Sequence, residues 1–169
     1  SLERPFEAVL AGLPLRLRID RVDRTPAGLV VIDYKTGEAR VTQWRGTRPD
    51  APQLPLYAAL AGDEVAAVAF AVVRPTGVAY RGVGEEAVGV PGLTAAERFR
   101  IADSEDAGLS WAELRTRWGA WLAKLAEQYL AGVADVAPKQ PTTCRLCHLG
   151  TLGRVDRRPA EDEDEGLHG

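Results

Sequence analysis

One short stretch of this chain joins two strand-like segments through a turn, and it constrains the fold more than any other part. Residues 18–23 alternate in polarity, residues 24–28 contain proline and glycine, and residues 29–34 form an apolar run rich in β-branched side chains. This pattern predicts a β-hairpin with its turn at 24–28. A hairpin of this length brings Asp20 of its first strand close to Asp33 of its second.

Lys35 is expected beside these two acids. Side chains along a strand alternate between faces, so Asp33 and Lys35 project to one side and Tyr34 to the other. Only three of the 21 basic residues are lysines. Lysine is a compact donor whose pKa can fall on burial, whereas arginine stays protonated. A simple ion pair between Asp33 and Lys35 is the structural alternative, and Asp20 at hairpin distance weighs against it.

Two carboxylates beside one ammonium suit a hard divalent cation. Mg²⁺ takes oxygen ligands in near-octahedral geometry and is usually held by one or two carboxylates, with water and substrate phosphate completing its shell. A cation lowers the pKa of a bound water and polarises a phosphodiester, while Lys35 orients that water or helps to deprotonate it. The residues therefore indicate metal-assisted hydrolysis of a phosphodiester.

A predicted helix after the hairpin supplies two further polar side chains. Asp50 suits its N-cap, Pro52 its first turn and Gly62 its end. Gln53 and Tyr57 then lie one turn apart on one face. An amide and a phenol there can bond phosphate oxygens or the catalytic groups. The alternative is a short amphipathic helix with an ordinary tyrosine.

Taken in order, these residues resemble the PD-(D/E)XK nucleases, in particular the RecB-like branch with its Gln-x-x-x-Tyr motif, and the resemblance covers residues 2–147. The matching features are Asp20, the thirteen-residue interval, Asp33-Tyr34-Lys35 and Gln53-Leu54-Pro55-Leu56-Tyr57. The resemblance implies an α/β fold with a restriction-endonuclease-like core. In that core a mixed β-sheet, made of an antiparallel meander and a crossover strand, is flanked by helices.

The resemblance also implies a role for each matching residue. Asp20, Asp33 and the main-chain carbonyl of Tyr34 would be ligands of Mg²⁺ or Mn²⁺, and Lys35 would be the catalytic lysine. The Gln-x-x-x-Tyr element, here Gln53 and Tyr57, would lie beside the active site. The implied substrate is DNA, as a single strand or a duplex end, with exonuclease favoured over endonuclease action. Helicase-like or other domains of the same full-length protein, and a role in DNA repair or end processing, are implied as well.

The beginning of the chain departs from the family pattern. Related nucleases carry a helix before the first strand that supplies a histidine or glutamate to the metal, but this chain opens in a segment that resembles that first strand. His148 and His168 lie far downstream, and neither Glu3 nor Glu7 is assigned as a ligand. We therefore expect a fragment that lacks this helix, has an incomplete metal site and is weakly active or inactive in isolation.

A second departure concerns the cysteines. Cys144 and Cys147 resemble the Cys-x-x-Cys of iron-sulfur members of the branch, but the position of the third cysteine is Gly153 and the chain has no other cysteine. Two thiolates are too few for a cluster held by four cysteines or for a four-ligand zinc site. We expect a vestigial motif and no iron-sulfur cluster, and reduced thiols rather than a disulfide. A cysteine upstream of the fragment is the lesser alternative.

Composition and charge fit one domain followed by a tail. The 169 residues are 46% hydrophobic, and we assign residues 1–152 to the nuclease domain and residues 153–169 to an acidic, disordered tail. The five acids at 161–165 account for more than the net charge of −3, because the remainder carries +2. In the loop before the predicted helix, Arg40, Arg45 and Arg48 are candidates for DNA phosphate contacts.

Hydrophobic patterning predicts the remaining elements. Residues 2–10 and 13–22 should form a meander with 29–34, and the apolar residues 65–74 a strand that crosses back beside it. The other expected elements are an edge strand at 78–83, helices at 53–61 and 94–99, and a long helix that begins with a capping box at Ser110-Trp111-Ala112-Glu113 and ends before Gly132. The aromatic stripe of that long helix is expected to pack in the core.

The sequence has no run of transmembrane length and no secretion signal, so we expect a cytoplasmic protein without membrane contact. Two other functions remain open at this level. The first is a degenerate nuclease fold that binds DNA or a partner without cutting it. The second is a small-molecule or protein-interaction domain whose acids are structural, and the absence of any divalent-metal binding would distinguish it.

Overall fold

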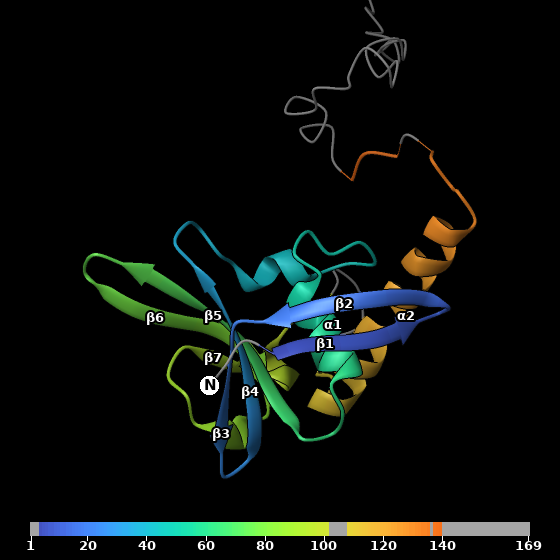
Figure 1. The fold of residues 1–169 in the computed structure, drawn as a ribbon. Helices are drawn as coiled ribbons and strands as arrows, with labels where there is room; N and C mark the ends of the chain where they lie inside the picture. The colour runs from blue at the N-terminus through green and yellow to red at the C-terminus, as the bar shows by residue number, and fades with distance from the viewer. Residues whose placement is uncertain (1–3, 102–107, 136, 140–169) are drawn as a thin grey trace, which may run out of the picture. The chain divides into compact units, whose positions relative to one another are not determined.

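The computed structural model describes residues 4–101, 108–135 and 137–139 (Figure 1). The chain divides into two compact units, Ser1–Gly132 and Val133–Gly169, and every helix and strand given below lies in the first. The cysteine motif and the acidic tail expected from the sequence lie outside the described residues. Among the helices that are described, none is both long and apolar enough to span a bilayer.

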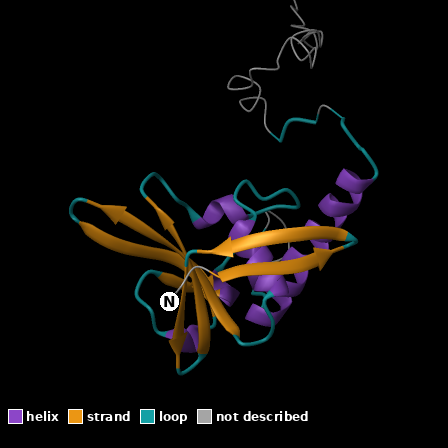
Figure 2. Ribbon diagram, viewed as in Figure 1, coloured by secondary structure: helices purple, strands orange, loops and turns teal. Residues whose placement is uncertain are grey.

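A five-stranded mixed sheet forms the centre of the first unit (Figure 2). Its strands, in spatial order, are β3 (Arg21–Thr25), β4 (Gly28–Lys35), β5 (Val65–Arg74), β6 (Gly77–Gly84) and β7 (Leu93–Ala95). β4 and β5 are parallel, and the crossover between them contains η1 (Val41–Trp44) and α1 (Gln53–Leu60). The mixed α/β fold with a crossover strand is therefore confirmed.

The predicted continuous strand over residues 13–22 is wrong, because the chain changes sheets at Asp20. β1 (Arg4–Leu10) and β2 (Leu13–Ile19) form a separate two-stranded antiparallel sheet, and β3 begins only at Arg21. The inward residues of β2 pack against the core beneath the helices, whereas β3 follows β4. One straight strand cannot satisfy both partners.

Three local predictions also need correction. The hairpin turn contains only Pro26 and Ala27, since Thr25 already pairs with Gly28. Asp50 does not cap α1, whose N-cap is Pro52 without a side-chain hydrogen bond. The backbone N–H of Asp50 instead donates to the Gln43 carbonyl, which holds that residue in the loop.

The third correction concerns the predicted helix at 94–99. Its first residues belong to β7, which pairs in parallel with Gly82–Gly84 of β6, and only a short 3₁₀ helix, η3 (Ala96–Arg98), follows. Gly92 permits this pairing: its φ is +87°, and a Cβ there would lie 2.1 Å from the Tyr80 carbonyl oxygen. β7 thereby pairs with the Gly82–Gly84 end of β6, and among the described residues no strand pairs with residues 77–81 on that side.

The long helix α2 (Trp111–Leu130) begins with the predicted capping box. Its aromatic stripe is core packing as predicted, because Trp118 is fully buried and its ring meets those of Trp44 and Trp111 edge-on. Trp118 Nε1 also donates to the Trp44 carbonyl at 3.1 Å. Tyr129, in the last turn, departs from the stripe and is 72% exposed.

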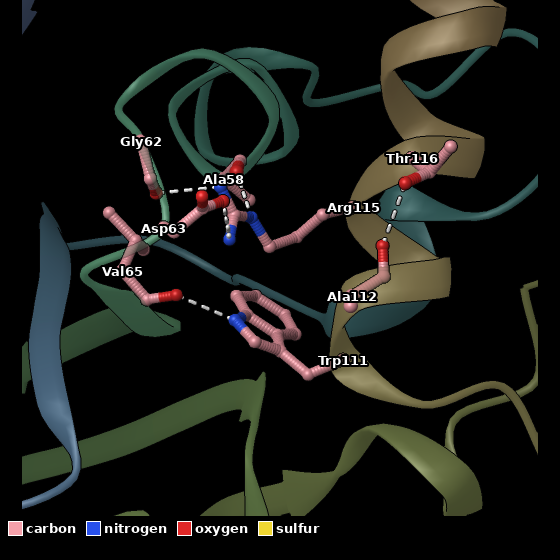
Figure 3. Close-up of polar contacts among 8 residues, drawn as sticks. All are labelled: Ala58, Gly62, Asp63, Val65, Trp111, Ala112, Arg115 and Thr116. Atoms are coloured by element: carbon pink, nitrogen blue, oxygen red, sulfur yellow. Dashed lines mark hydrogen bonds and ion pairs between the residues drawn. The ribbon is translucent and has the colours of Figure 1, made fainter.

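The first turns of α2 anchor the end of α1 and the start of β5 (Figure 3). Trp111 Nε1 donates to the Val65 carbonyl at 2.6 Å. The Arg115 guanidinium donates to the carbonyls of Ala58 and Gly62, the second at 2.6 Å. A cation bonded to the last carbonyls of a helix satisfies groups that have no intrahelical partner. Arg115 therefore fixes where α1 ends.

We expect Arg115→Ala to lower the free energy of unfolding by about 2 kcal/mol, because it removes charge-assisted hydrogen bonds from a half-buried side chain. Urea unfolding measures this change. Lys124→Ala, on the exposed side of the same helix, is the matched control and should change stability by less than about 0.5 kcal/mol. Equal losses in the two variants would show that the Arg115 contacts contribute nothing specific.

Candidate active site

β4 presents Asp33 and Lys35 on one face of the sheet. Asp33 is 5% exposed, and its Oδ2 lies 2.6 Å from Lys35 Nζ, whose side chain is 41% exposed. The contact is an ion pair without hydrogen-bond alignment, so Oδ2 is a buried carboxylate oxygen that accepts no hydrogen bond from the described residues. Such an atom is costly to bury unless a positive charge is close.

Asp20 joins this pair from the neighbouring chain segment. Arg21 pairs with Ile32 in the β3–β4 ladder, so one further step of the same register sets Asp20 opposite Asp33. The Tyr34 backbone N–H donates to Asp20 Oδ2 at 3.0 Å. One carboxylate oxygen of Asp20 thus accepts a hydrogen bond from the backbone of β4, and the other oxygen is available to a ligand.

The helix α1 brings Gln53 and Tyr57 to the same place. Gln53 Nε2 donates to the Arg18 carbonyl at 3.3 Å, which ties the start of α1 to the end of β2. Tyr57 is 1% exposed. Burial raises the pKa of its phenol, and the negative charges of Asp20 and Asp33 raise it further, against a lowering by hydrogen bonding to Gln53 and to the Arg18 backbone. The phenol therefore stays protonated beside the two carboxylates.

Phe70 forms an aromatic wall beside the charged groups, and the sequence analysis did not identify it. It pairs with Asp33 in the parallel β4–β5 register, and Lys35 Nζ lies 5.9 Å from its ring centroid. The Trp44 ring packs on it with a centroid separation of 4.8 Å. In the sequence Phe70 is one of nine apolar residues in a row, and only the register of the crossover strand reveals its position.

The opposite face of β4 carries Tyr34, whose side chain is directed away from Asp33 and Lys35. It is 44% exposed, and its hydroxyl accepts a hydrogen bond from Arg21 Nη1 at 3.1 Å. Arg21 also pairs with Asp23 at 2.7 Å. Both contacts raise the pKa of Arg21, the bond to Asp23 most. These contacts fix the side chain of the residue whose carbonyl the sequence analysis assigned to the metal.

The three arginines predicted to contact DNA lie in the loop between β4 and α1. Arg40 forms an ion pair with Glu38, and the Arg45 guanidinium packs over the Phe99 ring at 5.6 Å. Arg48 is exposed. Arg40 and Arg45 thus make contacts within the protein. The other predicted positions, Cys144 and Cys147, lie outside the described residues.

The acids fit a cation site of the two-carboxylate kind. No cluster of three or more histidine, cysteine, aspartate or glutamate side chains occurs within residues 4–101, 108–135 and 137–139. Mg²⁺ does not require one, because one or two carboxylates with water and substrate phosphate complete its shell. The buried Asp33 Oδ2 and the second oxygen of Asp20 supply the donors that such a shell uses.

Comparison with known proteins identifies the family. Residues 1–151 match the family model described as the PD-(D/E)XK nuclease superfamily, and the chain belongs to this superfamily. Nucleases of this superfamily act on nucleic acids and typically use divalent metals. No curated protein matches the chain.

One solved structure, titled "Crystal structure of SSO0001", is similar with a TM-score of 0.40 and 15% sequence identity. The alignment covers 89% of this chain and 57% of that one, so this chain spans a little over half the length of that structure.

Substitutions at Asp20 separate its backbone contact from its charge. We expect Asp20→Asn to keep an acceptor for the Tyr34 N–H, whereas Asp20→Ala leaves that N–H without its partner. The alanine variant should be about 1–2 kcal/mol less stable than the asparagine variant. It should also show faster hydrogen exchange at the Tyr34 amide. Equal exchange in the two variants would contradict the contact.

The environment of Tyr57 makes a prediction about pH. In metal-free protein its phenol should titrate above the ordinary value of 10.0. A folded pKa above the unfolded one gives stability that is complete below pH 10 and is lost as pH rises through the folded pKa. Spectrophotometric titration against Tyr57→Phe measures the shift, and Asp20→Asn should reduce it by removing a neighbouring negative charge. A Tyr57 signal that titrates at or below 10.0 would place the phenol in solvent.

Proposed function

We propose that this chain is a divalent-metal-dependent DNA nuclease domain that hydrolyses phosphodiester bonds within a larger DNA repair or end-processing protein. The observation that carries the proposal is the convergence of Asp20, Asp33 and Lys35 at the end of β4 in a chain of the nuclease superfamily. A buried carboxylate beside a second acid and an ammonium is costly as pure structure, whereas hydrolysis of a phosphodiester uses all three groups.

Asp20, Asp33 and the Tyr34 carbonyl would hold Mg²⁺ or Mn²⁺. A bound cation of this kind supplies Lewis-acid polarisation of a phosphoryl oxygen and offsets the negative charge of the transition state. The placement of the two carboxylates on adjoining segments supports their assignment as ligands. The carbonyl ligand rests on the family resemblance alone.

Lys35 has the position expected of a residue that acts on the attacking water or on the scissile phosphate. Its ammonium is fixed by Asp33 on one side and by the Phe70 ring on another, yet its side chain stays 41% exposed. It can therefore reach a substrate while remaining oriented. We assign Lys35 as a hydrogen-bond donor that orients the water and stabilises the phosphate charge.

Gln53 and Tyr57 complete the proposed site from α1. Gln53 donates a hydrogen bond to the carbonyl of Arg18, two residues before Asp20. This contact therefore helps to set where the first acid lies. The protonated phenol of Tyr57 adds a neutral donor close to both carboxylates. This arrangement supports assignment to the RecB-like branch. From that family resemblance we also propose exonuclease rather than endonuclease action and partner domains of helicase type. We further propose a cytoplasmic location.

Metal binding tests the ligand assignment. Calorimetry with Mn²⁺ should detect one site in the wild-type protein, and Asp33→Ala should reduce the affinity at least about tenfold because it removes the buried ligand. Asp23→Ala is the matched control, since this acid is paired with Arg21 instead. Equal Mn²⁺ affinity in the wild-type and Asp33→Ala proteins would exclude the proposed site.

The role of Lys35 is tested by separating cleavage from binding. In the full-length protein, Lys35→Ala should reduce Mg²⁺-dependent DNA cleavage by about 10²-fold or more, while DNA affinity stays within about threefold. Lys124→Ala, which removes a distant exposed lysine, should leave cleavage unchanged. Cleavage by Lys35→Ala at the wild-type rate would refute the assignment. A wild-type protein that binds DNA and Mn²⁺ but never cuts would instead indicate a non-cutting nuclease fold.

A further inference from the structure

A groove of about 250 Å³ lies at the tip of the β5–β6 hairpin. Its lining includes the paired residues Val72 and Ala79, called its floor below, and also Arg74, Thr76 and Arg81. In Figure 1 the tip of this hairpin, drawn in green, points away from α1 and α2. The tip is therefore accessible to a large ligand.

Strand register connects this groove directly with the proposed active site. Lys35 pairs with Val72, which pairs with Ala79, so the lysine and the groove floor form one row across three strands. The row two residues earlier contains Asp33, Phe70 and Arg81, so one strand separates Asp33 from Arg81. Paired residues of neighbouring strands direct their side chains to the same face. With strands about 4.8 Å apart, the groove begins about 10 Å from the acids.

The lining of the groove is positively charged, and no carboxylate contributes to it. The side chain of Arg74 makes no ion pair or hydrogen bond with any residue that the structure describes. Arg81 donates from Nη1 to the Ala39 carbonyl at 3.2 Å, and this fixes its orientation while other N–H groups stay available. Arg40 and Arg45, by contrast, already have partners in their own loop and in the core.

We propose that this groove binds backbone phosphates of the nucleic-acid strand next to the bond that is cut. The inference rests on the proposed nuclease function and adds the path of the substrate. Charges along one strand recur at about 3.4 Å of helix rise, so a strand held at the acids reaches Arg74 and Arg81 within a few nucleotides. Guanidinium groups bind phosphate oxygens in pairs of hydrogen bonds, and the Thr76 hydroxyl is a further donor. The groove fixes register and reads no bases.

Binding of a fluorescent single-stranded oligonucleotide to the full-length protein tests this path. The measurement is made in EDTA, because contacts with the groove need no cation. We expect Arg74→Ala and Arg81→Ala each to weaken binding roughly tenfold for every oligonucleotide sequence. Each should also reduce the slope of log K against log salt by about 0.7, the value for one phosphate contact on a single strand. Arg74→Glu should weaken binding further.

Arg24→Ala is the matched control. This arginine is exposed at the far end of the β3–β4 hairpin, where it pairs with Glu64, and its loss should leave affinity and salt slope unchanged. Because Arg81 also holds the Ala39 carbonyl, Arg74 provides the test that disturbs no contact among the described residues. Wild-type affinity and slope in Arg74→Ala and Arg74→Glu would overturn the proposed path.

Cleavage assays with Mg²⁺ on the same proteins distinguish the two levels of the proposal. If the wild-type protein cleaves DNA and the groove variants bind like the Arg24→Ala control, the substrate path is wrong and the nuclease function stands. If the wild-type protein neither binds nor cleaves DNA, both fall together. Reduced affinity and salt slope confined to the Arg74 and Arg81 variants would support the path.

Discussion

The hydrogen bond from the Tyr34 N–H to the Asp20 carboxylate fixes the first acid against β4 at the point where the chain passes from β2 to β3. Where β2 ends and β3 begins, the backbone ladder is interrupted, and a side chain replaces the missing partner of β4. The first acid therefore lies where the chain leaves one sheet for the other.

Burial of the second acid, Asp33, costs free energy because its carboxylate is removed from water. Lys35 offsets this cost at 2.6 Å, but Oδ2 accepts no hydrogen bond from the described residues, and the phenol of Tyr57 lies close by with a raised pKa. Polar groups held in this way are expected where function outweighs stability. In the proposed function, a divalent cation would neutralise the two acids together.

The crossover between β4 and β5 assembles the rest of the site. Because β5 returns parallel to β4, it sets Phe70 beside Asp33, and the intervening α1 delivers Gln53 and Tyr57 to the same point. The contacts of Trp111 and Arg115 at the end of α1 secure that crossover from outside. The same strand continues past the acids into the hairpin that carries Arg74, so the candidate site and the proposed substrate path share one strand.

The sequence by itself determined the local pieces of this protein. Alternation along β4 assigned Asp33 and Lys35 to one face of that strand, and the spacing in α1 assigned Gln53 and Tyr57 to one face of that helix. The capping box located the start of α2. These patterns depend only on neighbours along the chain. Tertiary structure decided the rest. The sheet change at Asp20, the pairing of Gly92 and β7 with β6, and the rows that join Asp33 to Phe70 and Arg81 all depend on contacts between distant segments. Local spacing does not specify such contacts.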